Sequence, residues 1–414
     1  MRRSSLLALS PPAHAVATAC GLKKGPVPDS LALAWLMLPL GAALGWYLAR
    51  RWPRPHEQDT AGSPEYLTGL THLVNQDPDQ AIAAFVKAVE VDDETVELHL
   101  TLGSLFRKRG EVDRALRIHE NLLARPNLNP LYRNQARFEL AQDFLKAGVI
   151  DRAEALFKEL VAQGMFLQPS LEHLLALYEQ VRDWRQALEA ARQLEAVKSA
   201  SLRPLIGQYY CERAEAARAR QDLPEALRLA GRALAEHPEC VRASLLQGAL
   251  HEAGADPAAA IKSYRRVPDQ DPRFIGEVLE PLRRCYEGLQ DRAGYAAFLE
   301  EAEELWRHPS VVLARARLMR AESIDPGAYL AERLQRQPNW RGLDLLLQVS
   351  GERVPEAAPL VEGLRRAMVK VLERRPVYQC LHCGFTPTLL FWQCPSCKQW
   401  TTVVPLEEFG AADT

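Results

Sequence analysis

From about residue 65 onward, the chain is dominated by stretches rich in Ala, Leu, Glu, Arg and Gln, separated by short polar turns that contain Asp. These residue types favour helices. A small residue returns on the second predicted helix of each unit, at intervals of 34, 38, 34, 39 and 34 residues: Ala81, Ala115, Ala153, Ala187, Ala226 and Ala260. Twelve residues earlier stand Gly69, Gly103, Ala141, Leu175, Ala214 and Gly248, and four residues later stand Phe85, His119, Phe157, Ala191, Ala230 and Tyr264. The spacing predicts helices in pairs.

A period near 34 residues with small residues at these positions is typical of tetratricopeptide repeats. Each unit is predicted to be a helical hairpin that cannot bury its own apolar face, so the units must stack. We therefore predict an all-α superhelix, or α-solenoid, over residues 65–375, with a seventh unit at about 280–306 and degenerate helices to about Arg374. An unrelated helical bundle is the alternative, and the three intervals of 34 residues argue against it.

Stacked hairpins form a long concave surface that binds peptides or protein domains and rarely carries catalysis. In the well-formed unit ELHLTLGSLFRKRG, we expect Arg107 and Lys108 to lie toward this groove and to bind acidic residues of a partner. The alternative is a solvated helix end, where basic residues favour the helix dipole.

Residues 31–49 (LALAWLMLPLGAALGWYLA) form a run of 19 uncharged residues, which matches the length of a transmembrane helix. Aromatic residues near its ends and the basic residues Arg50, Arg51 and Arg54 after it predict a single span with the rest of the chain in the cytoplasm, although Lys23 and Lys24 flank the other end. Gly41 and Gly45 form a small-xxx-small pair that could pack against another membrane helix. A buried core helix or a secretory signal is the alternative interpretation.

The segments around this span have little pattern of their own. Residues 1–30 form an N-terminal extension that resembles a poor signal peptide, and we interpret residues 1–28 as the product of a start site assigned too far upstream. Residues 50–64, with Pro53, Pro55, Gly62 and Pro64, are predicted to be a linker.

Four of the eight cysteines lie close together near the C-terminus as C-x2-C-x10-C-x2-C: Cys380, Cys383, Cys394 and Cys397. Two C-x-x-C turns that face each other predict a closed site of four thiolates for one structural metal ion, with zinc preferred and rubredoxin-type iron as the alternative. We expect a positive φ at Gly384 and a strand at 388–392, and we interpret His382 as a bystander. Cys211, Cys240 and Cys285 are interpreted as isolated core thiols.

This metal module, residues 376–406 before a tail at 407–414, is too small to be stable without the metal. Its aromatic residues are predicted to form an apolar face that docks on the last helices of the array: Phe385, Phe391, Trp392 and Trp400. Loss of one metal ligand would then release the module.

Composition narrows the function classes. The 414 residues carry a formal net charge of −2, which gives no support to a nucleic-acid binder held by bulk positive charge. The hydrophobic share of 47% and the charged share of 25% are typical of a folded chain. The sequence has no H-E-x-x-H, G-x-x-x-x-G-K-[ST] or G-x-S-x-G motif, so we expect no enzyme.

The order of parts resembles the lipopolysaccharide assembly protein B family of Gram-negative bacteria. The similarity is carried by LPLGAALGWYLARR (38–51), EVDDETVELHLTLGSLFRKRGEVDRALRIHENLL (90–123), AGVIDRAEALFKEL (147–160) and YQCLHCGFTPTLLFWQCPSCKQW (378–400). The resemblance implies an inner-membrane protein with cytoplasmic repeats. It also implies that the protein acts with the membrane protease FtsH and promotes turnover of the deacetylase that commits carbon to lipid A. On this chain it implies metal ligation by the four clustered cysteines, membrane contacts at 31–49 and a docking surface at 65–306.

Three functions are compatible with these patterns. The first is a non-enzymatic adaptor that regulates lipopolysaccharide synthesis through proteolysis. The second is a scaffold that gathers synthesis and transport enzymes without directing proteolysis. The third is a redox protein that uses rubredoxin-type iron. A homodimer also remains open.

Overall fold

The computed structural model describes residues 43–44, 46–47, 68, 71–72, 80, 96–353, 356, 358–372 and 375–406. The chain divides into two units, Met1–Leu67 and Thr68–Thr414, and the second contains the helical array and the metal module. Most of the predicted span 31–49, including Gly41 and Gly45, lies outside the described residues, as do Gly69, Ala81 and Phe85 of the first predicted repeat. No described helix combines the length and the apolar character that a membrane crossing requires.

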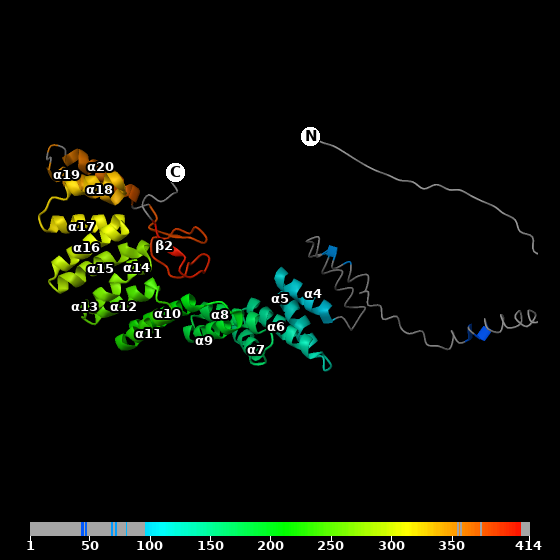
Figure 1. Cartoon of the computed structure of the whole chain (residues 1–414). Coiled ribbons are helices and arrows are strands. Elements are labelled where there is room, and N and C mark those ends of the chain that lie inside the picture. The colour runs from blue at the N-terminus through cyan, green and yellow to red at the C-terminus, as the bar shows by residue number, and fades with distance from the viewer. Residues whose placement is uncertain are drawn as a thin grey trace, which may run out of the picture. The chain divides into compact units, whose positions relative to one another are not determined.

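The predicted helical pairs are present in the described part of the array (Figure 1). Five hairpins succeed one another: α4 (Val96–Arg109) with α5 (Val112–Leu123), α6 (Pro130–Lys146) with α7 (Ile150–Ala162), α8 (Leu167–Val181) with α9 (Trp184–Lys198), α10 (Arg203–Ala219) with α11 (Leu223–Glu236), and α12 (Val241–Ala253) with α13 (Pro257–Arg265). These hairpins confirm a solenoid built from tetratricopeptide-like units.

The array continues beyond these hairpins, as predicted. After the short α14 (Val267–Gln270) and the 3-10 turn η1 (Pro272–Phe274) come α15 (Ile275–Gly288), α16 (Arg292–Trp306), α17 (Pro309–Ala321), α18 (Gly327–Arg336), α19 (Trp340–Arg353) and α20 (Ala358–Leu372). The predicted seventh unit corresponds to α15 and α16, which begin about five residues earlier than expected.

The small residues of the repeat pattern allow the two helices of each hairpin to approach closely. Side chains at the predicted alanine positions are fully buried in all described units: Ala115, Ala153, Ala187, Ala226 and Ala260. At Gly103 and Gly248, a Cβ atom would overlap the rings of His119 and Tyr264, which come from the paired helix. At these two positions the paired ring leaves no room for a side chain, which explains the glycine.

Each hairpin turn uses the same backbone geometry. The residue that ends the turn has a positive φ: Gly110, Gly148, Arg182, Gln221, Ala255 and Gln290. The next backbone N–H donates to a carbonyl five residues earlier, for example from Asp183 to Tyr178 at 2.9 Å. This bond is the signature of a Schellman-type helix end. In four turns the following Asp side chain caps the next helix, which explains the Asp in the predicted turns: Asp183, Asp222, Asp256 and Asp291.

Arg107 links two consecutive repeats. Its guanidinium donates to Glu139 at 2.6 Å and to Asp143 at 2.8 Å, both on α6. Asp143 is also 2.5 Å from Nδ1 of the fully buried His119. Charges removed from water need such partners. Arg107 therefore already has two carboxylate partners inside the array, whereas Lys108 is exposed.

The chain ends in a small module with two antiparallel strands, β1 (Tyr378–Cys380) and β2 (Val403–Pro405), in which Cys380 pairs with Val403. The predicted strand at 388–392 is wrong, because this segment forms a loop. Two of its apolar side chains, Leu390 and Trp392, are partly buried against a cluster formed by helices of the array and Val404, without a partner strand.

The rings of His119 and Tyr264 leave no space for a side chain at Gly103 and Gly248, so substitution of either glycine should destabilise the fold. Gly103→Ala and Gly248→Ala are each expected to lower the free energy of unfolding by about 1 to 3 kcal/mol, because the His119 or Tyr264 ring must shift. The measurement is urea denaturation followed by circular dichroism. The matched control is Gly231→Ala within α11, where a Cβ has no atom within 4 Å and should raise stability by about 0.5 to 1 kcal/mol. Equal destabilisation at all three positions would contradict this packing account.

Candidate metal centre and its docking on the repeats

The two C-x-x-C segments fold into matching turns. The N–H of Gly384 donates to the Cys380 carbonyl, and that of Lys398 donates to the Cys394 carbonyl, both at 2.9 Å. Gly384 has the predicted positive φ of 74°, and Lys398 has a φ of 60° at the equivalent position. Sequence reasoning missed Lys398, since only a glycine signals this conformation directly.

These turns bring all four clustered cysteines to one centre. Their Sγ atoms lie within 4.8 Å of one another. The Cys380–Cys397 and Cys383–Cys394 separations are both 3.7 Å. A tetrahedral ion with metal–sulfur bonds of about 2.3 Å requires sulfurs about 3.8 Å apart, whereas a disulfide requires about 2.05 Å. The geometry therefore fits a four-thiolate metal site.

The surroundings of Cys380 and Cys397 shift the pKa values of these two thiols in opposite directions. Burial opposes ionisation of Cys380, but the Thr402 hydroxyl and the backbone N–H groups of Cys383 and His382 outweigh it and lower the pKa of this thiol to about 6. The Thr402 Oγ1 atom is 3.2 Å from the Cys380 sulfur. Burial raises the pKa of Cys397 to about 11. Cys397 thus depends on the charge of a bound cation to become a thiolate.

The remaining cysteine and histidine predictions have mixed outcomes. His382 is exposed and lies outside the group of four sulfurs. Cys211, Cys240 and Cys285 are buried, as expected for core thiols. The Cys211 and Cys240 sulfurs are 4.0 Å apart, so these two are not isolated. No short-range signal could have shown this contact, because the two residues come from different repeats.

Trp400 joins the module to helices α8, α9 and α10. Its indole N–H donates to Glu179 Oε1 at 2.9 Å, and its ring meets those of Trp184 and Tyr209 edge-on, with centroids 6.0 Å away in each case. Tyr209 donates to the same carboxylate oxygen at 2.5 Å. Burial and the Glu179 charge raise the pKa of Tyr209, so its hydroxyl remains a donor. One carboxylate thus binds one side chain from the module and one from the array.

Arg242 on α12 lies next to both module tryptophans. Its guanidinium carbon is 6.0 Å from the ring centroids of Trp392 and Trp400. The residue is only 3% exposed, and it pairs with Glu212 at 2.7 Å and Glu215 at 3.0 Å. A guanidinium removed from water is stabilised by paired carboxylates and by aromatic faces. Arg242 therefore connects the module electrostatically to the array.

The module also contacts later helices. Trp392 stacks on Phe274 of η1 with centroids 5.8 Å apart, and Tyr378 donates to Glu277 on α15 at 2.8 Å. Trp400 packs against the apolar cluster of α6–α12, whereas Trp392 and Val404 pack with the cluster of α12–α17. The module therefore bridges two apolar clusters of the array.

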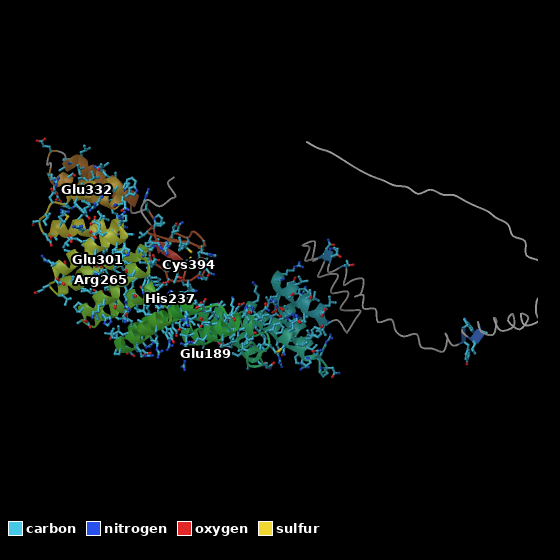
Figure 2. The ribbon with its side chains drawn as sticks, viewed as in Figure 1. Glu189, His237, Arg265, Glu301, Glu332 and Cys394 are labelled. Atoms are coloured by element: carbon cyan, nitrogen blue, oxygen red, sulfur yellow. The ribbon has the colours of Figure 1, made fainter. Side chains whose placement is uncertain are left out.

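This position corrects two predictions. The main docking contacts are with helices α8 to α15 rather than with the last helices; Figure 2 shows Cys394 of the module beside this middle part of the array. Phe385 and Phe391 are each 38% exposed, so they do not form the docking face. Only Trp392 and Trp400 confirm the predicted contact. Glu179 contacts Trp400 and Arg242 contacts Trp392. An apolar pattern in the sequence does not reveal such polar contacts.

Family models match both the metal module and parts of the helical array. The family model of the rubredoxin metal binding domain matches residues 378–405, and the tetratricopeptide repeat model matches residues 66–128 and 211–273. A solved tetratricopeptide repeat protein from Parabacteroides merdae covers 62% of this chain and 97% of its own, at 15% identity and a TM-score of 0.32.

Curated relatives extend over nearly the whole chain. Lipopolysaccharide assembly protein B of Escherichia coli (strain K12) is 35% identical over 382 residues, which covers 91% of this chain and 98% of the relative. The protein of the same name from Haemophilus influenzae is 32% identical over 406 residues, with 90% and 98% covered. Because the similarity includes both the repeats and the metal module, this chain belongs to the lipopolysaccharide assembly protein B family.

Proposed function

We propose that this protein is a non-catalytic adaptor in lipopolysaccharide assembly, and that its helical array binds partner proteins. The observation that supports this most directly is the bridging position of the metal module, which packs against both apolar clusters of the array. A solenoid whose units contact only their neighbours can flex along its length. A bridge between two sections resists that flexing and keeps a docking surface in one shape, which reduces the cost of binding.

The metal is proposed to act as a structural element of this bridge. Cys380, Cys383, Cys394 and Cys397 would hold one Zn²⁺, which supplies folding stability and no reaction. Iron fits four sulfurs equally well, and it would favour the redox function instead.

The finer proposal concerns partners. The chain would be fixed in the inner membrane by residues 31–49, with its repeats in the cytoplasm, and would hold the lipid A deacetylase near an FtsH-type protease. Holding two proteins together raises their effective concentration without any chemistry by the adaptor. Gly41 and Gly45 would contact partner membrane helices or a second copy, and Lys108 would contribute to the groove.

Depletion separates the adaptor from the scaffold. If the adaptor proposal holds, loss of this protein raises the amount of lipid A deacetylase several-fold, because its degradation slows, as measured by immunoblotting after synthesis is stopped. Re-expression of the full chain should restore turnover, and a variant without residues 31–49 should not. An unchanged half-life of the deacetylase would contradict the adaptor proposal and favour the scaffold.

Metal analysis tests the proposed zinc site. The purified chain should hold about one zinc per molecule and be colourless. Cys394→Ser, at a fully buried sulfur, should lose the metal and make the module sensitive to limited proteolysis, whereas Cys285→Ser, a buried cysteine outside the cluster, should keep both metal and resistance. A red protein with reversible reduction would instead identify iron. Wild-type protease resistance in the Cys394 variant would show that docking does not depend on the metal.

Trp400→Ala tests the bridge itself. Loss of the indole removes its bond to Glu179 and its packing on Tyr209, so the unfolding free energy should fall by about 2 to 3 kcal/mol. Hydrogen exchange should rise in both α8 and α10 while the metal stays bound. Phe385→Ala, at an exposed aromatic on the same module, should change stability by less than about 1 kcal/mol. If the two variants behave alike, Trp400 is not the docking contact.

A further inference from the structure

Two buried cysteines from consecutive repeats lie side by side, outside the group of four sulfurs in the metal module. Cys211 is on α10, and Cys240 is the residue that precedes α12. Their side chains are 0% and 2% exposed, and their sulfur atoms are 4.0 Å apart. The candidate metal site is made by other cysteines, so it does not use these two thiols. They form a second cysteine pair, to which the adaptor proposal assigns no chemistry.

The surroundings of Cys240 are polar although the residue is buried. The Gln208 amide donates to its sulfur at 3.5 Å, and the carbonyl oxygen of the same amide accepts from Arg242 at 3.4 Å. The sulfur also lies at the N-terminal end of α12, where the backbone N–H of Ala243 donates to it. An amide donor, a helix N-terminus and a nearby guanidinium all favour negative charge on this sulfur.

The two thiols differ in how readily they ionise. The hydrogen bonds from Cys211 and from the Ala243 N–H lower the pKa of Cys240, although burial opposes them. The hydrogen bond between the two thiols and burial raise the pKa of Cys211. The thiolate is the nucleophile in cysteine chemistry, and a neighbouring thiol can resolve its oxidised product. Cys240 is therefore the better nucleophile of the pair, and Cys211 is placed to react second.

The two sulfurs are close enough to form a bond after a small movement. Both cysteines are free in this structure. A disulfide requires sulfurs about 2.05 Å apart, so the separation of 4.0 Å must decrease by about 2 Å. Rotation about the Cα–Cβ bonds moves the sulfurs and can supply this change. The bond would connect two consecutive repeats through their buried contact.

The pair lies beside the contact between the array and the metal module. Arg242 follows Cys240 by two residues, and its guanidinium carbon is 6.0 Å from the rings of Trp392 and Trp400. A bond from Cys240 to α10 would fix the start of α12, the helix that carries Arg242. The oxidation state of the two thiols therefore bears on the section of the array that contacts the module.

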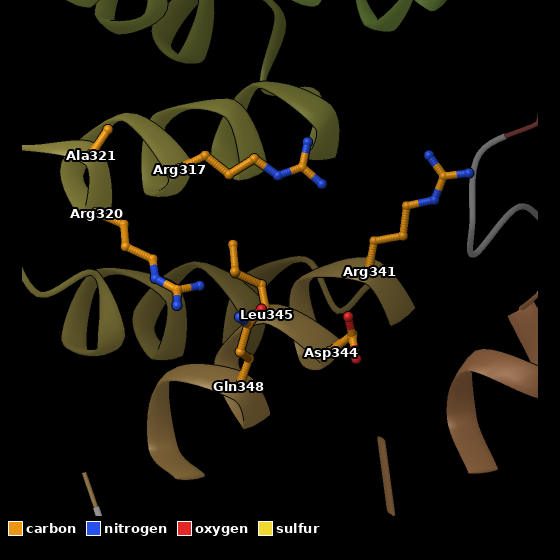
Figure 3. Close-up of a pocket in the computed structure, with 7 residues that line it drawn as sticks. All are labelled: Arg317, Arg320, Ala321, Arg341, Asp344, Leu345 and Gln348. Atoms are coloured by element: carbon orange, nitrogen blue, oxygen red, sulfur yellow. The ribbon is translucent and has the colours of Figure 1, made fainter. Parts of the chain in front are cut away.

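The cavity of about 400 Å³ between α17 and α19 offers no comparable chemistry (Figure 3). Among the described residues that line it there is neither a cysteine nor a histidine. Figure 3 shows Arg320 on α17 and Asp344 on α19 at this cavity. Arg320 donates to Glu352 and Asp344 accepts from Arg365, so both charges already have partners.

We propose that Cys211 and Cys240 are a reversible redox site, at which hydrogen peroxide oxidises the two thiols to an intramolecular disulfide. The Cys240 thiolate attacks one peroxide oxygen, the O–O bond breaks, and the departing hydroxide takes up the Cys240 proton as water. The Cys211 thiol attacks the resulting sulfenic acid, the S–O bond breaks, and a second water leaves with the Cys211 proton. The two thiols together lose two electrons, and the peroxide gains them.

The burial and the setting of the pair suit a transient modification. A buried sulfur admits only a small, neutral oxidant or reacts during local opening, and hydrogen peroxide meets the first requirement. Disulfides in reducing compartments are usually transient or redox-sensing. The proposal requires no partner protein, so it and the adaptor proposal can fail independently.

The test treats the full purified chain with hydrogen peroxide, alkylates the remaining thiols, and maps disulfides by mass spectrometry of proteolytic peptides. Most molecules should acquire a bond between Cys211 and Cys240, and dithiothreitol should remove it. Cys285 is the internal control, because burial raises the pKa of this thiol to about 12 and it should remain free. Free thiols at both Cys211 and Cys240 after the same treatment would overturn the proposal and leave an ordinary pair of core thiols.

Two variants test the separate roles of the sulfurs. In Cys211→Ser, the sulfenic acid at Cys240 has no resolving thiol, so dimedone should trap it and add its mass to that peptide. In Cys240→Ser, Cys211 should not react with dimedone, because its pKa is raised. Equal labelling in the two variants would contradict these roles, and circular dichroism checks that each variant is folded. Mapping in the wild-type chain needs no substitution, so it decides the proposal even if a variant fails to fold.

Discussion

The connection between the metal module and the helical array depends on the contact between two tryptophans of the module and one buried arginine of the array. Arg242 has its guanidinium 6.0 Å from the rings of both Trp392 and Trp400 while Glu212 and Glu215 balance its charge. A buried guanidinium is costly without such partners. The two tryptophan rings reach Arg242 only if the loops of the module are held in place. Four sulfurs bound to one metal ion would hold these loops. A metal bound by the four sulfurs would therefore support this contact with the array.

A second constraint operates within each repeat. Small residues let the two helices of most hairpins approach closely, and the glycines at 103 and 248 lie directly against the rings of His119 and Tyr264. Each unit can therefore form its hairpin from its own residues, but it needs neighbouring units to bury its apolar face. Ion pairs such as that of Arg107 with Glu139 and Asp143 then join consecutive units. Local packing thus builds the array, and the metal module adds the long-range connection that neighbour contacts cannot provide.

These two constraints agree with a protein whose task is to hold others. The array offers a long helical surface, and the module packs against two of its apolar clusters. Preorganised surfaces bind with less loss of conformational entropy than flexible ones. Membership of the lipopolysaccharide assembly protein B family gives the proposed protein binding its cellular context.

The sequence by itself determined the features that arise from short-range patterns. The spacing of Gly103, Ala115 and His119 specified the hairpin, the Asp residues specified the turns, and the paired cysteines specified the metal site, because neighbouring residues alone decide each of these. Only the tertiary structure decided what lies far apart in the chain. Trp400 and Glu179 form a hydrogen bond although 221 residues separate them. The loop at 388–392, the exposure of Phe385 and the contact of Cys211 with Cys240 likewise depend on where the module docks and how the repeats stack. An apolar residue in the sequence shows that it favours burial, but the choice of its partner depends on polar groups and shapes that folding brings together.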